Sequence, residues 1–151
     1  MNQNDVLRRI RYILDLDDSK MMSIFSLGGS EFTRAEISDW LKKDDDPAYQ
    51  QMKDLQLAAF LNGLIVEKRG RKDGPQLKPE KQLTNNKIFM KLKIAFDLKA
   101  EDTLAILALN DFKISKHELS AFFRKPTHKH FRVCKDQVLR NLLKGLQLKY
   151  R

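Results

Sequence analysis

The densest group of potential ligand-binding side chains is the segment RKPTHKHFRVCK at residues 124–135. Arginine and lysine donate charge-assisted hydrogen bonds to phosphate oxygens, and an arginine fork can hold one phosphate through two bonds. Phe131 could stack on a base if it is exposed, although a core position is the more common role for such an aromatic. The segment therefore predicts phosphate contacts. Its cations are Arg124, Lys125, Lys129, Arg132 and Lys135.

Arg140 and Lys144 extend this basic segment on the helix that is expected to follow it. They lie one helical turn apart and therefore share one face of that helix. Together the seven residues predict a cationic face that contacts the backbone of RNA or DNA with little reading of base sequence.

Sequence-specific reading of DNA is a competing hypothesis. Residues 104–125 combine an apolar helix, a break and a second helix with a basic exit, which resembles a helix-turn-helix. The residues that would read bases are Lys116, His117 and Ser120. The signal is weak, because the break is longer than the usual turn and any two packed short helices produce the same pattern.

Metal binding is a third hypothesis, because His128, His130 and Cys134 are residue types that bind zinc. Their spacing matches no short zinc motif and no fourth ligand is evident, so we predict neither a metal site nor another cofactor. Cys134 is better explained as a small buried residue near the start of the last helix. As the only cysteine, it also excludes an intrachain disulfide.

Catalysis is the fourth hypothesis. Asp15 and Asp97 occupy matching places in the two halves of the chain and could form a carboxylate pair for acid–base chemistry. We favour a structural role, in which each aspartate turns the chain from one helix into the next. The sequence contains no P-loop, dinucleotide fingerprint, nucleophile elbow or HExxH motif. We therefore predict no catalytic residue and expect a protein that is not an enzyme.

These residues are positioned by a unit that occurs twice. Residues 4–69 and 86–151 align without a gap at a constant offset of 82, and 15 of the aligned pairs are identical. Each unit is near the lower size limit for an independent core, so we expect the two units to pack on each other. We predict a first helical repeat over 1–69, a polar linker over 70–85 and a basic second repeat over 86–151.

Apolar periodicity and capping residues predict four helices in each repeat and no strand, and hence an all-α fold. Asn4 and Asn86 stand where an N-cap would begin the first helix of each repeat. The third helix of each repeat begins at a capping box, over residues 33–36 and 115–118.

Gly63 and Gly145 lie at matching positions within the fourth helix of each repeat. A glycine inside a helix costs about 1 kcal/mol relative to alanine, so its presence in both copies indicates that another helix approaches its backbone. We expect that neighbour to be the first helix or a helix of the other repeat.

The net charge of +9 is divided unevenly along the chain. Residues 1–69 carry 10 Lys/Arg against 12 Asp/Glu, which gives −2. Residues 70–85 carry 4 against 2, and residues 86–151 carry 15 against 6, which gives +2 and +9. A basic excess confined to one copy favours a polyanionic partner for that copy, although a basic protein can also simply be soluble.

The two copies differ most in charge at the loop before the last helix. Asp44, Asp45 and Asp46 of the first repeat align with Pro126, Thr127 and His128 of the second, and Ala58 and Asn62 align with Arg140 and Lys144. The flanks align without a gap, so we expect both loops to follow the same backbone path.

The sequence shows no apolar run long enough to span a membrane, and its start, MNQNDVLRR, lacks the apolar stretch of a signal peptide. We therefore expect a soluble cytoplasmic protein with no membrane partner.

Several segments resemble a known family. They are NDVLRRIRYILDLDD at 4–18, FLNGLI at 60–65, ELSAFFRKPTHKHFRVC at 118–134 and LRNLLKGL at 139–146. These runs are similar to the YehS-like family of small bacterial proteins, which are built from two copies of a domain of unknown function. The resemblance covers nearly the whole chain, implies a duplicated helical unit in a bacterial cytoplasm and brings no catalytic residues. The family pattern often has a cysteine at the position of Met52, and this departure bears on the metal hypothesis.

Two functions remain open from the sequence. The favoured one is a non-enzymatic protein that binds nucleic-acid backbone through the second repeat. The alternative is a protein–protein adaptor, or a self-associating protein, that uses the acidic loop at 44–46 and the basic loop at 124–135. Head-to-tail contact between these two loops would produce homo-oligomers.

Overall fold

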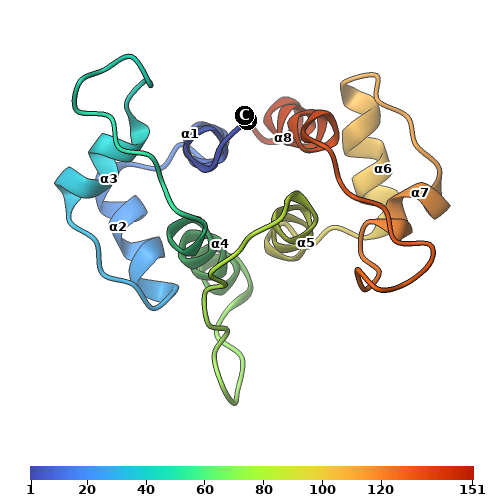
Figure 1. The fold of residues 1–151 in the computed structure, drawn as a ribbon, viewed down its shortest axis with the longest axis horizontal. Helices are drawn as coiled ribbons and strands as arrows, with labels where there is room; N and C mark the ends of the chain where they lie inside the picture. Colours follow the sequence, from blue (N-terminus) through green and yellow to red (C-terminus); the bar gives the residue numbers. More distant parts are fainter.

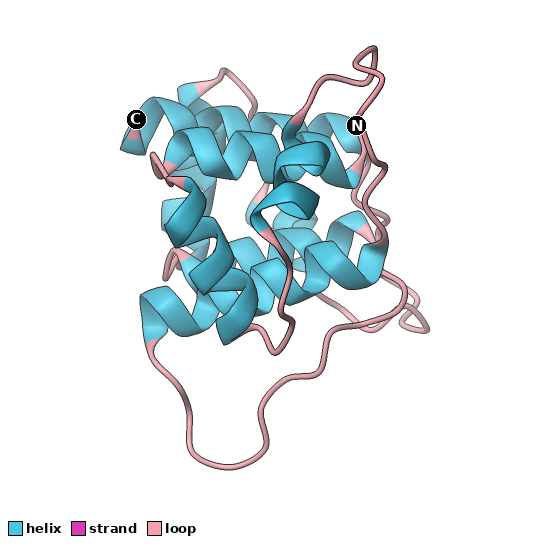
Figure 2. Ribbon diagram, turned by 90° about the vertical axis from the view of Figure 1, so that its left-hand side faces the viewer, coloured by secondary structure: helices cyan, strands magenta, loops and turns pink.

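The computed structural model describes residues 1–151 and contains eight helices and no strand (Figure 1, Figure 2). The helices are α1 (Gln3–Ile13), α2 (Asp18–Leu27), α3 (Arg34–Leu41), α4 (Asp54–Arg69), α5 (Asn85–Ala95), α6 (Ala100–Leu109), α7 (Lys116–Ala121) and α8 (Asp136–Tyr150). Each helix of the second repeat begins 82 residues after its counterpart. The predicted all-α tandem of two four-helix units is confirmed. None of the helices is both long and apolar enough to cross a membrane.

The two repeats pack on each other with pseudo-twofold symmetry. Helix α1 packs on α8 and α4 packs on α5, while the pairs α2/α3 and α6/α7 lie at opposite outer sides (Figure 1). The buried apolar side chains form one cluster of 32 residues, to which both repeats contribute. Each repeat therefore completes its core with the other, as the small size of the unit predicts.

The α1/α8 and α4/α5 pairs run parallel, because contacts exchanged between the repeats join their starts and their ends. The aspartate that opens α4 or α8 accepts a hydrogen bond from the residue before the N-cap of the partner helix, and an arginine at the far end forms an ion pair. The contacts are Leu83 N to Asp54 Oδ2 (2.9 Å), Met1 N to Asp136 Oδ2 (3.3 Å), Arg69 to Asp97 (3.0 Å) and Arg151 to Asp15 (3.2 Å). These aspartates and arginines are identical in the two repeats.

The prediction that Asn4 and Asn86 are N-caps is wrong. The caps of α1 and α5 are Asn2 and Thr84, which lie one position before the first helical residue. Asn4 and Asn86 are buried within the first turn, at 0% and 8% exposure. Each cap satisfies an amide of its helix start, so the buried asparagine is free to bind another part of the chain.

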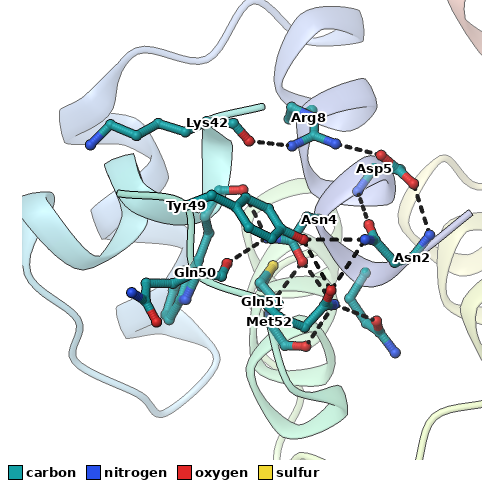
Figure 3. Close-up of polar contacts among 11 residues, drawn as sticks. Asn2, Asn4, Asp5, Arg8, Lys42, Tyr49, Gln50, Gln51 and Met52 are labelled. Carbon is teal, nitrogen blue, oxygen red and sulfur yellow. Dashed lines mark hydrogen bonds and ion pairs between the residues drawn. The ribbon is translucent and has the colours of Figure 1, made fainter. Parts of the chain in front are cut away.

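Each buried asparagine, on the first helix of its repeat, forms hydrogen bonds to the loop that precedes the last helix of that repeat. Asn4 Nδ2 donates to the carbonyl oxygens of Trp40 (2.9 Å) and Gln50 (2.8 Å), and its Oδ1 accepts from the amide of Met52 (2.9 Å) (Figure 3). The equivalent bonds of Asn86 join it to Phe122 O (3.0 Å), Arg132 O (2.8 Å) and Cys134 N (2.9 Å). One amide thus holds both ends of the loop.

Gly63 and Gly145 do allow another helix to approach, but the neighbour differs from the expected one. A Cβ added at Gly63 would overlap the carbonyl oxygen of Ile24 in α2, and one added at Gly145 would overlap that of Ile106 in α6. The close contact therefore lies between the second and fourth helices within each repeat.

We expect Gly63→Ala and Gly145→Ala each to destabilise the protein by about 1–3 kcal/mol or more, because the new methyl group meets backbone that cannot rotate away. Thermal or urea unfolding measures the change. Gln137→Ala, at an exposed site on α8, is the control and should leave the unfolding midpoint unchanged. Glycine variants as stable as the control would show that the helices are not in contact there.

Candidate nucleic-acid interface

The loop between α7 and α8 follows the same backbone path as the loop between α3 and α4, as expected. Three backbone hydrogen bonds of one loop recur at aligned positions in the other. They are His128 N to Lys125 O (2.8 Å), Phe131 N to His128 O (3.0 Å) and Arg132 N to Ala121 O (3.2 Å), matched by Asp46 N to Lys43 O (3.0 Å), Tyr49 N to Asp46 O (3.0 Å) and Gln50 N to Asp39 O (3.2 Å). The two loops therefore share one backbone frame, while their net charge is 0 over residues 42–53 and +5 over residues 124–135.

His128 accepts the same kind of backbone hydrogen bond as Asp46, the residue at the aligned position. In the first repeat the Asp46 carboxylate accepts a hydrogen bond from the amide of Ala48 (2.8 Å). In the second repeat Nδ1 of His128 accepts from the amide of His130 (3.0 Å). The turn therefore keeps its side-chain acceptor while a negative charge is removed.

Arg124 has lost the acidic neighbour of its counterpart. At the aligned position, Lys42 Nζ lies 2.5 Å from Asp39 Oδ1, and this hydrogen bond raises the pKa of Lys42. Ala121 stands at the place of Asp39 in the second repeat, so no carboxylate is present to neutralise Arg124. The half-buried Arg124 is thus available to an external anion.

The other predicted cations of the loop fall into two groups. Lys125, Lys129 and Lys135 are exposed, whereas Arg132 forms an ion pair with Glu118 at 3.1 Å. The pKa of Glu118 is lowered first by the amide of Ser115 in its capping box and then by Arg132. Arg132 is therefore partly neutralised within the protein. Phe131 is half-buried in the same loop.

The two predicted cations on α8 lie toward a different part of the molecule. Arg140 lines a groove of about 400 Å³ together with Arg8 and Arg9 of α1, and none of the loop cations lines it. Lys144, one turn further along α8, is half-buried. Sequence reasoning missed the two arginines of α1, although their adjacency in a helix whose other face is apolar was a usable signal.

The residues proposed for base reading lie on a helix of only six residues, α7. At 1.5 Å per residue such a helix is about 9 Å long, which is short for a recognition helix. Lys116, His117 and Ser120 are exposed, and Lys116 pairs with Glu101 at 3.7 Å. This arrangement favours backbone contacts over base reading.

The residue types that bind metal do not form a ligand set. Within the chain, no three His, Cys, Asp or Glu side chains gather closely enough to hold a metal ion. Cys134 is buried, and burial, followed by the nearby Asp136, raises the pKa of its thiol to about 12. A neutral buried thiol packs as a small apolar residue.

Asp15 and Asp97 have structural roles. Their φ angles of 52° and 54° are left-handed, and the amide of Leu16 bonds back to Arg11 (3.0 Å) in a Schellman-type helix end. Each carboxylate pairs with an arginine of the other repeat, so the two do not form a dyad.

Comparison with known proteins matches this duplicated architecture. A family described as "Protein of unknown function (DUF1456)" matches residues 3–70 and again residues 85–151. The chain belongs to this family. It is also 46% identical over 147 residues to "Uncharacterized protein YehS" of Escherichia coli (strain K12). The alignment covers 97% of this chain and 94% of that protein. No solved structure matches. The resemblance inferred from the sequence is therefore confirmed.

We expect Asn86→Ala to destabilise the protein by about 3 kcal/mol, because it leaves three backbone groups of the loop without partners. It should also expose Cys134, whose amide the asparagine holds. The rate at which Cys134 reacts with an aromatic disulfide reagent at mildly alkaline pH, followed by absorbance, measures this exposure.

Asn4→Ala is the matched control. It removes the equivalent hydrogen bonds from the first repeat and leaves the hydrogen bond between Asn86 and the amide of Cys134 intact. Thiol reactivity should rise strongly in Asn86→Ala alone. Equal rates in the two variants would show that Asn86 does not hold the loop locally.

Proposed function

We propose that this protein binds nucleic-acid backbone through the loop between α7 and α8, without reading base sequence. The observation that carries the proposal is a rise in net charge, from 0 over residues 42–53 to +5 over residues 124–135, on a shared backbone frame. The first repeat builds the same loop with three aspartates, and it has lysines at the positions of Arg124, Lys125 and Lys135, so the changes over residues 126–132 are not needed for folding. Their role is more readily explained by an external anion.

The loop offers four cations without an ion-pair partner in the chain, namely Arg124, Lys125, Lys129 and Lys135. Cations spread along an exposed loop suit a ligand with regularly spaced phosphates. Arg132 contributes less, because Glu118 already holds it. Arg140 and Lys144 remain part of the proposed cationic face on α8. Such a ligand implies a cytoplasmic location, in keeping with the single reduced cysteine.

We expect the affinity for a labelled single-stranded oligonucleotide to fall steeply with salt. Neutralising three or four phosphates gives a slope of log affinity against log salt of about −2 to −3, since each contact contributes about −0.7. Fluorescence anisotropy over a fourfold salt increase should therefore show a loss of about 20-fold or more. An affinity that barely changes would count against the proposal.

The matched pair Lys125→Glu and Lys43→Glu separates the loop from overall charge. The two lysines occupy aligned positions and both are exposed, so the change in net charge is the same. We expect Lys125→Glu alone to lower oligonucleotide affinity severalfold, and Lys129→Glu added to it to bring the loss to about tenfold or more. Lys43→Glu should have a much smaller effect. Equal losses would mean that only net charge matters.

The alternative is self-association between the acidic loop at 44–46, which is exposed, and the basic loop of a second copy. The same samples distinguish the two proposals. Protein that purifies without excess absorbance from nucleic acid, and whose mass rises with concentration and falls with salt, would favour self-association. Asn substitutions at Asp44, Asp45 and Asp46 should then abolish the assembly.

A further inference from the structure

One of the two parallel helix pairs, α4/α5, is contacted by the linker that joins its helices. The linker between these helices, residues 70–84, is non-helical. It first projects away from the molecule, as the loop at the bottom of Figure 1, and its last residues return along the helix pair to α5. Its Glu80 Oε1 lies 3.1 Å from Nζ of Lys91, which is only 8% exposed and also donates to Asn62 Oδ1 at 2.5 Å. A carboxylate on an extended segment thus neutralises a cation of the helix pair.

The pseudo-symmetric α1/α8 pair has no such cover. Its groove of about 400 Å³ is lined by α1, α8 and Met1 alone, with no linker residue. The linker lies on the opposite side of the molecule (Figure 1). Arg9 stands at the position of Lys91, but the partner that the structure gives it is the neutral Gln147 Oε1 at 3.4 Å. The counterpart of the Glu80 carboxylate is missing.

Substitutions between the repeats change the charges at this open groove. Among the residues that line it, Arg8 replaces Met90 and Arg140 replaces Ala58, whereas Asp5 replaces Lys87. Among the lining residues, three arginines face one carboxylate, that of Asp5. The open groove therefore has a surplus of positive charge where the covered one is neutralised by Glu80.

One of the three arginines at the groove is already fixed within the protein. Arg8 is held by Asp5 and by the carbonyl oxygen of Lys42 (2.6 Å), so its guanidinium loses little freedom on binding (Figure 3). Arg140 is exposed and Arg9 is half-buried at the same groove. A guanidinium fork binds a carboxylate through two parallel hydrogen bonds.

We propose that the α1/α8 groove binds an extended acidic peptide segment of a partner protein, with a carboxylate seated on Arg9 and Arg140. The linker shows that the equivalent groove accepts an extended polypeptide that carries a single glutamate. A run of nucleic-acid phosphates fits less well, because Asp5 lines the same groove. The site differs from the proposed nucleic-acid loop, and either proposal can fail without the other.

The test uses the full chain without an affinity tag and a labelled peptide that alternates glutamate with alanine. We expect the glutamate peptide to bind and its glutamine counterpart not to bind. Arg9→Gln combined with Arg140→Ala should weaken peptide binding by about tenfold or more, through loss of charge-assisted hydrogen bonds. Arg140→Ala restores the residue of the first repeat, Ala58, so the fold should tolerate it.

Arg11→Gln is the matched control, since it removes a positive charge from α1 at an exposed residue outside the groove. It should leave peptide affinity unchanged, as should Lys125→Glu with Lys129→Glu. Arg9→Gln alone, which leaves the proposed cationic face with Arg140 intact, should in turn keep its oligonucleotide binding. NMR shifts on the unmodified protein provide a second readout, and they should map to α1 and α8.

Two results would overturn the proposal. One is a glutamate peptide that fails to bind at millimolar concentration or binds the arginine variant as well as the unmodified protein. The other is an oligonucleotide that displaces the peptide and loses its own affinity in Arg9→Gln, which would show that the groove binds phosphate.

Discussion

The buried asparagine amide is the contact on which the rest of this structure depends. In each repeat it joins the first helix to both ends of the loop before the last helix, through Asn4 or Asn86. All three of its partners are backbone groups, so the contact fixes the path of the loop without restricting its side chains. Removing the amide would leave buried donors and acceptors unpaired, which costs far more than a surface bond.

This constraint explains how one fold can present loops of different charge. Both loops carry lysines, but the first balances them with consecutive aspartates, whereas the second has none and adds Lys129 and Arg132 on the same frame. The pseudo-twofold interface adds a second asymmetry. Identical aspartates and arginines join the helix pairs at both ends, but the linker covers only the α4/α5 pair. The scaffold is thus shared, and the loop and the open groove are where the copies differ.

Local signals predicted the parts of the fold that depend on short-range bonding. The capping boxes at Thr33 and Ser115 have the expected bonds, and Gly63 does meet a neighbouring helix. The role of Asn4 could not be predicted, because asparagine suits a cap as well as a buried clamp and only the tertiary fold brings Trp40 and Met52 to it. The adjacency of Arg8 and Arg9 could have marked them as a basic pair, but only the packing of α1 on α8 decides that they line a groove.

The most direct test of this account transplants the basic loop. Residues 44–48 of the first repeat are replaced by the sequence PTHKH of residues 126–130, together with Asp39→Ala, in a chain whose own basic loop carries Lys125→Glu and Lys129→Glu. Oligonucleotide affinity is then measured at low salt. The account predicts a folded protein that regains binding through its first repeat. A chain that unfolds, or that folds and does not regain binding, would contradict it.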